Sequence, residues 1–183
     1  MKKWLLLALP MFLTGCGYNT IQTKDETAAA AKQQIEVQLQ RRADLVPNLV
    51  ETVKGYAAQE ERIFTEVAQA RAGLAGAVRG GNVGEMAQAN DQMTGALGRL
   101  LAISEAYPQL KSDQTFLRLQ DELAGTENRI AVSRTDYNNA VRDYNAYIRR
   151  FPAVLTAKVT GAKSREYFEV TNAANREAPA VKF

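Results

Sequence analysis

The sequence predicts an all-α fold, an antiparallel bundle of long helices. Apolar residues recur at alternating spacings of three and four, which is the heptad pattern of helices that share one buried seam. No stretch sustains the two-residue alternation that is typical of a strand. The chain holds five prolines, so its periodic segments run long before a helix-breaking residue interrupts them. We expect three long helices, the first kinked near Pro47, and a short C-terminal helix.

The first long helix is expected to begin near Thr23, because Thr23 and Glu26 have the spacing of a capping box. Pro47 lies inside the apolar pattern, where it removes one N–H group and crowds the Ala43 carbonyl. A kink or a restart is therefore expected there, with Asp44 placed to cap a restarted helix. The apolar positions of this helix are Leu39, Ala43, Val46, Leu49, Val50, Val53, Tyr56, Ala57, Ile63, Phe64, Val67 and Ala70.

The second helix is expected to begin at Asn82, which has an acid, Glu85, three residues later. It should stop before Pro108, because a proline disfavours helical backbone at the residue that precedes it. Its apolar face consists of Met86, Met93, Leu97, Leu100 and Leu101.

The third helix should follow a cap at Ser112 or Asp113 and end at Phe151. Large apolar side chains recur along it every seven residues. A short helix should follow around Ala153 to Val159. Because the links are short, neighbouring helices should run antiparallel. The residues of the seven-residue repeat are Phe116, Leu123, Ile130, Tyr137, Tyr144 and Phe151.

Residues 1–15 have the layout of a secretory signal peptide, with a basic start at Lys2 and Lys3 and an uncharged run from Trp4 to Leu13. Ten helical residues span about 15 Å, which is half of a bilayer core, so this run is not expected to cross a membrane. The sequence Leu13-Thr-Gly-Cys16 that follows resembles a bacterial lipobox. The alternative is an ordinary signal peptide whose cysteine falls there by chance.

We therefore expect Cys16 to be acylated and to become the N-terminus of a lipoprotein, since several acyl chains hold a protein firmly at a membrane. Gly17, in place of Asp, favours the outer over the inner membrane by resemblance to Gram-negative lipoproteins, with the protein on the periplasmic face. The expected order is a lipidated Cys16 with a tether over 16–23, a bundle over 24–169 and a tail over 170–183.

The composition excludes several classes of function. The chain has no histidine and a single cysteine, which excludes His/Cys zinc sites, His-dependent hydrolases, haem ligation by His and intramolecular disulfides. The net charge of +3 is too small to indicate a nucleic-acid partner. The adjacent acids Glu60-Glu61 and Asp121-Glu122 point about 100° apart on a helix, so neither forms an acid–base pair. We expect no catalytic residue, metal or cofactor.

Three stretches, in this order, resemble the LemA family. They are Tyr18-Asn19 with Gln40-Arg-Arg-Ala-Asp-Leu-Val-Pro-Asn-Leu-Val50, Val53-Lys54 and Tyr56-Ala57; then Tyr107-Pro-Gln-Leu-Lys111; then Phe116-Leu117, Leu119-Gln120, Leu123, Thr126-Glu-Asn-Arg-Ile-Ala131, Arg134, Tyr137-Asn138, Val141, Tyr144-Asn145, Phe151-Pro152 and Tyr167-Phe168-Glu169. The resemblance implies a membrane-tethered helical bundle with no established catalytic activity. Members of this family usually carry an N-terminal transmembrane helix, and this chain differs by its lipobox.

A polar cluster is expected beside the helix seam. Glu127 and Arg134 are seven residues apart and share one helix column, and the first helix brings Arg41, Arg42 and Asp44 to face them. The cluster either binds a partner or fixes the register of the helices, as polar residues in helical seams do.

Tyr137-Asn138 and Tyr144-Asn145 repeat one heptad apart. They form either a binding ladder or packed rings with polar edges. Residues 129–165 hold eight Lys/Arg and two acids, a net charge of +6, which suits either an anionic surface or a solvated face.

The residues thus favour a non-enzymatic envelope lipoprotein that acts as a helical scaffold or docking module, with the membrane and another envelope protein as partners. Two alternatives stay open. The first is a cell-wall or lipid-active enzyme that uses carboxylates, and the second is a self-assembling, membrane-organising scaffold that forms homo-oligomers.

Overall fold

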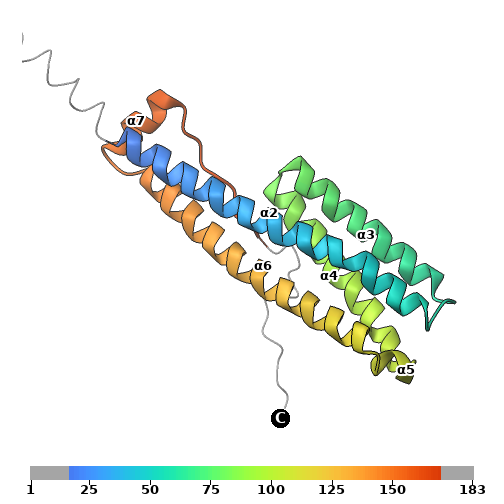
Figure 1. Ribbon diagram of the computed structural model, residues 1–183. Helices are drawn as coiled ribbons and strands as arrows, with labels where there is room; N and C mark the ends of the chain where they lie inside the picture. The colour runs from blue at the N-terminus through green and yellow to red at the C-terminus, as the bar shows by residue number, and fades with distance from the viewer. Residues whose placement is uncertain (1–16, 170–183) are drawn as a thin grey trace, which may run out of the picture. The chain divides into compact units, whose positions relative to one another are not determined.

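The computed structural model describes residues 17–169, which form α-helices, turns and connecting segments with no strand in that range (Figure 1). The all-α prediction is confirmed. The predicted signal peptide, the predicted lipidation site Cys16 and the tail from residue 170 lie outside the described residues. The helices are α2 (Tyr18–Lys54), α3 (Glu61–Gly80), α4 (Val83–Ala102), α5 (Pro108–Lys111), α6 (Gln114–Tyr147) and α7 (Ala153–Thr160), with a 3-10 turn, η1, at Ile103–Glu105.

The chain divides into two compact units. Unit 1 comprises the described residues up to Gln34 together with Ser133–Tyr167, and unit 2 comprises Ile35–Val132 and the described residues from Phe168 on. The helices α2 and α6 each contribute one part to unit 1 and the other part to unit 2.

Unit 1 has its own core where α2 begins and α6 ends. Ile21, Tyr144, Ile148 and Ala157 form a buried cluster against which Tyr147 and Ala162 also pack. Burial of Ile21 extends α2 to Tyr18, five residues before the expected start. The capping box predicted at Thr23 is therefore wrong, because the Thr23 hydroxyl donates to the Asn19 carbonyl inside the helix. Residues 18–23, expected in a tether, are helical.

Unit 2 contains an antiparallel hairpin of α3 and α4 (Figure 1). Its turn needs Gly81, which adopts a left-handed φ of 69° and donates its N–H to the Ala77 and Val78 carbonyls. The predicted cap at Asn82 is confirmed, since its side chain accepts from the Glu85 N–H over 2.9 Å. The helix α4 ends at Ala102, earlier than expected, and η1 and α5 fill the interval to the next helix.

The prediction of one long first helix is wrong in one respect. The chain continues as a helix through Pro47 to Lys54, breaks over residues 55–60, and resumes as α3. Asp44 does not cap a restarted helix; its carboxylate accepts from the Gln40 amide over 2.8 Å. The predicted seam is confirmed on both sides of the break, because Leu39, Ala43, Val46, Leu49, Val53, Ala57, Phe64 and Val67 are buried.

The third predicted helix is α6. Asp113 caps it, because the Asp113 carboxylate accepts from the Phe116 N–H over 2.8 Å. The repeat residues Phe116, Leu123, Ile130, Tyr137 and Tyr144 are buried as expected. Phe151 is an exception, because α6 ends at Tyr147 and leaves Phe151 79% exposed beyond the helix. The short helix predicted around residue 153 is confirmed as α7.

Candidate functional site

Arg42 forms the centre of a polar cluster inside unit 2. It lies on α2 with 4% of its surface exposed, between two apolar seam positions. Its Nη1 donates to the Asn90 side-chain oxygen on α4 over 2.7 Å. The same Nη1 lies 2.5 Å from Oε2 of Glu127 on α6. One guanidinium thus joins three helices of the unit. Arg42 and Glu127 are two of the five residues that the sequence places in this cluster.

The contact between Arg42 and Glu127 is an ion pair. Among the described residues, the buried Nε of Arg42 and the buried Oε2 of Glu127 have no assigned hydrogen-bond partner. Burial lowers the pKa of Arg42, and the Glu127 carboxylate opposes that shift. Arginine keeps its proton well above neutral pH, so Arg42 carries a fixed positive charge opposite the Glu127 carboxylate.

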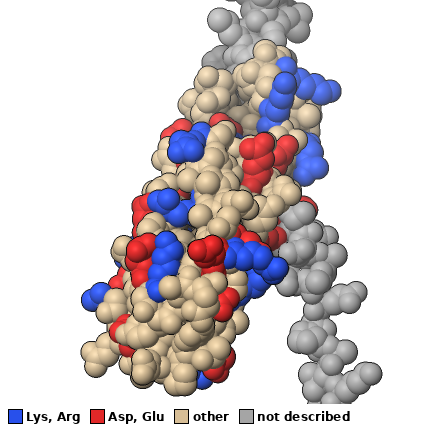
Figure 2. All heavy atoms as spheres, turned by 90° about the vertical axis from the view of Figure 1, so that its right-hand side faces the viewer, with Lys and Arg blue, Asp and Glu red and all other residues tan. Residues whose placement is uncertain are grey.

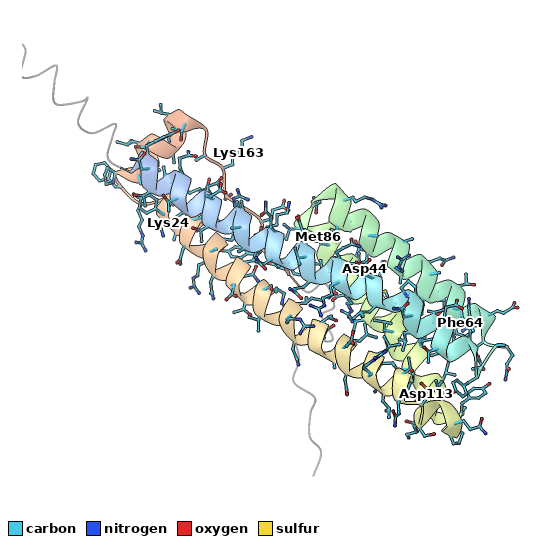
Figure 3. All side chains as sticks on the ribbon, viewed as in Figure 1. Lys24, Asp44, Phe64, Met86, Asp113 and Lys163 are labelled. Atoms are coloured by element: carbon cyan, nitrogen blue, oxygen red, sulfur yellow. The ribbon has the colours of Figure 1, made fainter. Side chains whose placement is uncertain are left out.

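The other predicted members of this cluster lie elsewhere. Arg41 and Asp44 are exposed on α2, and Figure 3 labels Asp44 on that helix. Arg134 is half-buried and belongs to unit 1, whereas Glu127 belongs to unit 2. The one residue of this cluster that sequence reasoning missed is Asn90. Nothing in the sequence around Asn90 indicates that it meets Arg42, because the two are brought together only when α2 and α4 pack.

The tyrosine–asparagine repeat holds a second cluster, in unit 1. Residues 162–167, called the strap here, follow α7 without regular secondary structure. The Asn145 side chain donates to the Arg165 carbonyl and accepts from the Arg165 N–H, both over 2.9 Å. The Tyr137 hydroxyl donates to the Glu166 carbonyl over 2.8 Å. These two members of the predicted ladder therefore fasten the strap to α6.

Arg165 also ties the strap to α2. Its Nε and Nη2 donate to the two carboxylate oxygens of Asp25 over 2.7 and 2.9 Å. This bidentate pair, first through its hydrogen bonds and then through the Arg165 charge, lowers the pKa of Asp25. Burial chiefly raises the pKa of Tyr144, with a further contribution from the Asp25 charge. The guanidinium of Arg165 lies 6.0 Å from the centre of the Tyr144 ring. Asn138, the remaining predicted member, is half-buried on α6.

A third polar group, at the end of unit 2, was not predicted as a site. The Tyr56 hydroxyl donates to the Asp113 carboxylate over 3.0 Å, and the Gln59 amide donates to the Tyr107 hydroxyl. The Phe116 N–H first, and then Tyr56, keep the pKa of Asp113 below its ordinary value. Tyr56 and Tyr107 both line a small hollow beside Pro108. The sequence did contain a sign of this polar group, because Tyr56 and Tyr107 are both among the residues that carry the family resemblance.

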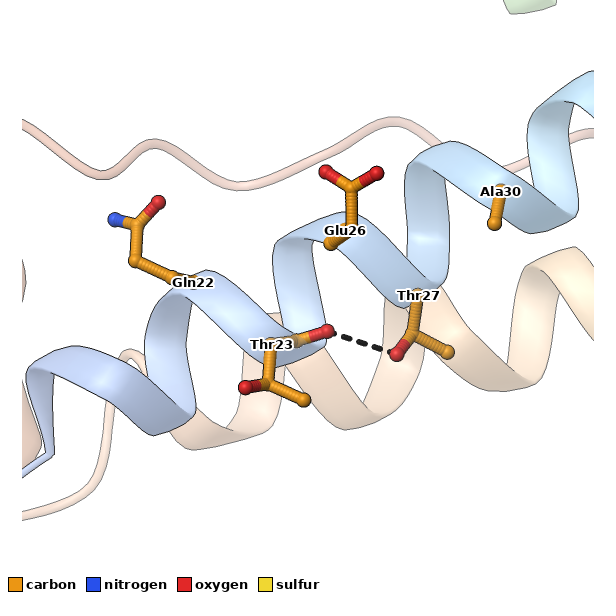
Figure 4. A pocket seen from close by; sticks show the side chains of 5 residues that line it. All are labelled: Gln22, Thr23, Glu26, Thr27 and Ala30. Atoms are coloured by element: carbon orange, nitrogen blue, oxygen red, sulfur yellow. Dashed lines mark hydrogen bonds between the residues drawn. The ribbon is translucent and has the colours of Figure 1, made fainter.

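The surface of unit 1 also has a shallow hollow along α2. All the residues that line it, Gln22, Thr23, Glu26, Thr27 and Ala30, come from that helix (Figure 4). The Thr27 hydroxyl donates to the Thr23 carbonyl over 2.8 Å. The hollow thus offers one carboxylate, Glu26, among small and amide side chains.

Two features are absent from residues 17–169. No helix in this range combines the length and apolar character needed to cross a bilayer. In the same part of the chain, no group of three Cys, Asp or Glu side chains lies close enough to hold a metal ion.

Comparison with known proteins places these features in a family context. The model of the LemA family matches residues 31–183. The magnetosome proteins MamQ 1 and MamQ 2 of Paramagnetospirillum magneticum are each 33% identical over 175 residues, covering 83% of this chain and 64% of each relative. The magnetosome protein MamQ of Magnetospirillum gryphiswaldense is 32% identical over 188 residues, covering 89% of this chain and 69% of the relative. The chain thus spans just under two thirds of the first two relatives.

Proposed function

The chain belongs to the LemA family, and we propose that it works as a non-enzymatic, membrane-anchored scaffold on the periplasmic face of the cell envelope. Acyl chains on Cys16 would hold it, with the outer membrane as the favoured site. The observation that carries the proposal is the start of α2 at Tyr18, two residues after Cys16. An anchor at Cys16 would thus join a 37-residue helix, about 55 Å long, almost directly.

The contacts that the buried polar side chains make support a scaffold role. Arg42 bonds Asn90 and pairs with Glu127, so its charge joins α2, α4 and α6 within unit 2. Asn145 bonds the strap within unit 1. These contacts hold helices and strap in register, which is the role that polar residues take in helical seams. What remains for a partner is the exposed surface of the helices.

The relatives support a part in a larger assembly. Their names assign them to magnetosomes, and we carry to this chain the proposal that it docks other proteins of the envelope. Self-assembly is the second candidate, favoured by the exposed apolar side chains of Val37 on α2 and Val132 on α6, which are 57% and 61% exposed.

Cell fractionation tests the anchor. Cys16→Ser should move the protein from the membrane to the soluble fraction and abolish labelling by a fatty-acid analogue. Thr14→Ser keeps a small residue before the cysteine and should be processed and anchored normally. If Cys16→Ser stays in the membrane fraction, the lipoprotein assignment is wrong.

Crosslinking in intact cells tests the docking role. A photoreactive amino acid at Val37 or Val132 should yield a discrete adduct with an envelope protein, whereas the same group at Glu51, which is also exposed on α2, serves as the comparison site. An adduct of twice the protomer mass would favour self-assembly. No adduct from any exposed helical position would contradict both candidates.

A further inference from the structure

The helix α7 exposes its large apolar residues and buries its small ones. Leu155 and Val159, one helical turn apart, are 55% and 86% exposed, and Phe151, just before the helix, is 79% exposed. Ala153 and Ala157, on the opposite side, are 4% exposed each. Since large apolar side chains normally take the buried side of a helix, this arrangement marks a surface made to meet an apolar phase.

Basic residues predominate in the segments of unit 1 on either side of α7. Residues 17–24 and 144–164 of unit 1 contain five Lys or Arg residues and no Asp or Glu. In Figure 2 the upper end, where α7 lies, shows uncharged spheres with Lys and Arg spheres beside them and Asp and Glu spheres further down. Cations close in sequence to an apolar patch complement an anionic surface. The five cations are Lys24, Arg149, Arg150, Lys158 and Lys163.

The described part of the chain begins beside α7, against its buried side. Gly17 adopts a φ of 112°, and a Cβ placed on it would lie 3.7 Å from the Cβ of Ala153 and 3.2 Å from the Tyr147 hydroxyl. The backbone of residue 17 therefore lies against the first residue of α7. Cys16 directly precedes Gly17 in the chain, and consecutive Cα atoms are about 3.8 Å apart. Acyl chains on Cys16 would thus bring the bilayer to within about one residue of α7.

We propose that α7 lies on the lipid surface, with Phe151, Leu155 and Val159 among the headgroups and upper acyl chains and with the five cations against anionic headgroups. The proposal rests on the lipid anchor at Cys16 proposed above. Interfacial helices have this pairing of one apolar face with Lys and Arg at its edges. An eight-residue helix offers a small surface, but the anchor keeps it at a high effective concentration, so weak contacts suffice. Each cation at the surface should strengthen binding about fivefold.

Tryptophan quenching tests the proposal. The one tryptophan of the sequence, Trp4, lies in the predicted signal peptide, so Leu155→Trp gives the processed protein a single reporter. The acylated protein is reconstituted into vesicles of phosphatidylethanolamine and phosphatidylglycerol whose acyl chains carry bromine, which quenches tryptophan on contact. We expect strong quenching of this reporter, and recovery of most of its emission when Phe151→Asp and Val159→Asp are added.

Tyr167→Trp is the matched control in the same unit. Tyr167 follows Glu166, whose carbonyl binds Tyr137, and Tyr137 lies ten helical residues, about 15 Å, from the end of α6 at Tyr147. The tryptophan emission of the Tyr167→Trp variant should be the same with brominated and unbrominated lipid. Circular dichroism of each variant before reconstitution confirms that the fold is kept.

The outcomes separate the two proposals. If the protein floats with the vesicles but Leu155→Trp is not quenched, the proposed lipid contact of α7 is wrong and the proposed anchor at Cys16 stands. If the tryptophan of Leu155→Trp is shielded from water equally well in the absence of vesicles, a second copy covers α7, and the lipid contact is overturned. Equal quenching of Leu155→Trp and Tyr167→Trp would show that unit 1 contacts the bilayer with no preference for α7, which also contradicts the proposal. If the acylated protein does not float, both the anchor and the lipid contact of α7 fall.

Discussion

The Nε of Arg71 donates to the carbonyl oxygen of Ala43 over 2.9 Å. In an uninterrupted helix this carbonyl would accept the N–H of the residue four positions later, which is Pro47 and has none. Arg71 therefore supplies from α3 the hydrogen bond that the proline removes from α2. Ala43 is 1% exposed, so without Arg71 its carbonyl would have little access to water.

Removing Arg71 should destabilise the protein in a way that depends on Pro47. We expect Arg71→Met to lower the free energy of unfolding by about 1 kcal/mol, because a buried carbonyl loses its donor. In a Pro47→Ala background the loss should fall toward zero, since the substitution restores a backbone N–H that can serve the Ala43 carbonyl. A double-mutant cycle in urea measures this coupling.

Arg62→Met is the control for that cycle. The Arg62 side chain is 88% exposed and pairs with Glu66 within the same helix, so its loss should cost less than about 0.5 kcal/mol in either background. Equal losses for Arg71→Met with and without Pro47 would show that Arg71 does not act through the Ala43 carbonyl.

The Arg42 cluster should prove structural. Arg42→Met is expected to cost about 2 kcal/mol of unfolding free energy, because Asn90 is left buried without its donor. Adding Asn90→Leu should recover part of that loss, since two apolar groups replace the hydrogen bond. The neighbouring exposed residue gives the control, Arg41→Met, for which urea denaturation should show little change. A loss that persists in full in the double variant would argue against this account.

The strap should be released by Asn145→Ala. The substitution removes both hydrogen bonds to the Arg165 backbone at a site that is 4% exposed, and should cost about 2 kcal/mol. Limited proteolysis should then cut residues 162–167 faster, while the helical circular dichroism stays close to that of the native protein. Asn139→Ala changes an exposed residue on the same helix, and its cleavage rate should match the native one.

Acid should weaken the attachment of the strap to α2. The pKa of Asp25 is lowered from its ordinary value of 3.8 when the protein folds, chiefly by the hydrogen bonds of Arg165. Its stabilising contribution is therefore complete above pH 3.8 and is lost as the pH falls through the lower, folded pKa. The Asp25 side chain is 39% exposed, so solvent weakens the effect.

The difference in urea midpoint between the native protein and Asp25→Asn should accordingly be clear near neutral pH and should vanish at a pH below the folded pKa of Asp25. Asp136→Asn, an exposed change on α6, controls for the loss of one negative charge. A difference between native protein and Asp25→Asn that is the same at both pH values would mean that the ion pair with Arg165 contributes no stability.

Much of the secondary structure could be read from the sequence. The caps at Asn82 and Asp113 are hydrogen bonds between residues three apart, so their energy depends on local sequence alone. The heptad positions from Phe116 to Tyr144 follow from helical periodicity, which requires no knowledge of the partner helix. Arg42 and Glu127 were both expected in one polar cluster, because polar residues beside facing helix seams can meet, but which members of the expected cluster make contact could not be predicted.

Sequence alone determined that the chain is helical, where α4 and α6 are capped and which faces the helices bury. Tertiary structure alone decided that α2 begins at Tyr18 and passes through Pro47, and that Asn145 holds a strap. The contacts responsible join residues that are far apart in the chain. Arg71 and Ala43 are 28 residues apart, Arg42 and Asn90 are 48 apart, and Arg165 and Asp25 are 140 apart. Such contacts arise after the helices pack, and their energy then overrides the local preference that a proline or a capping box expresses.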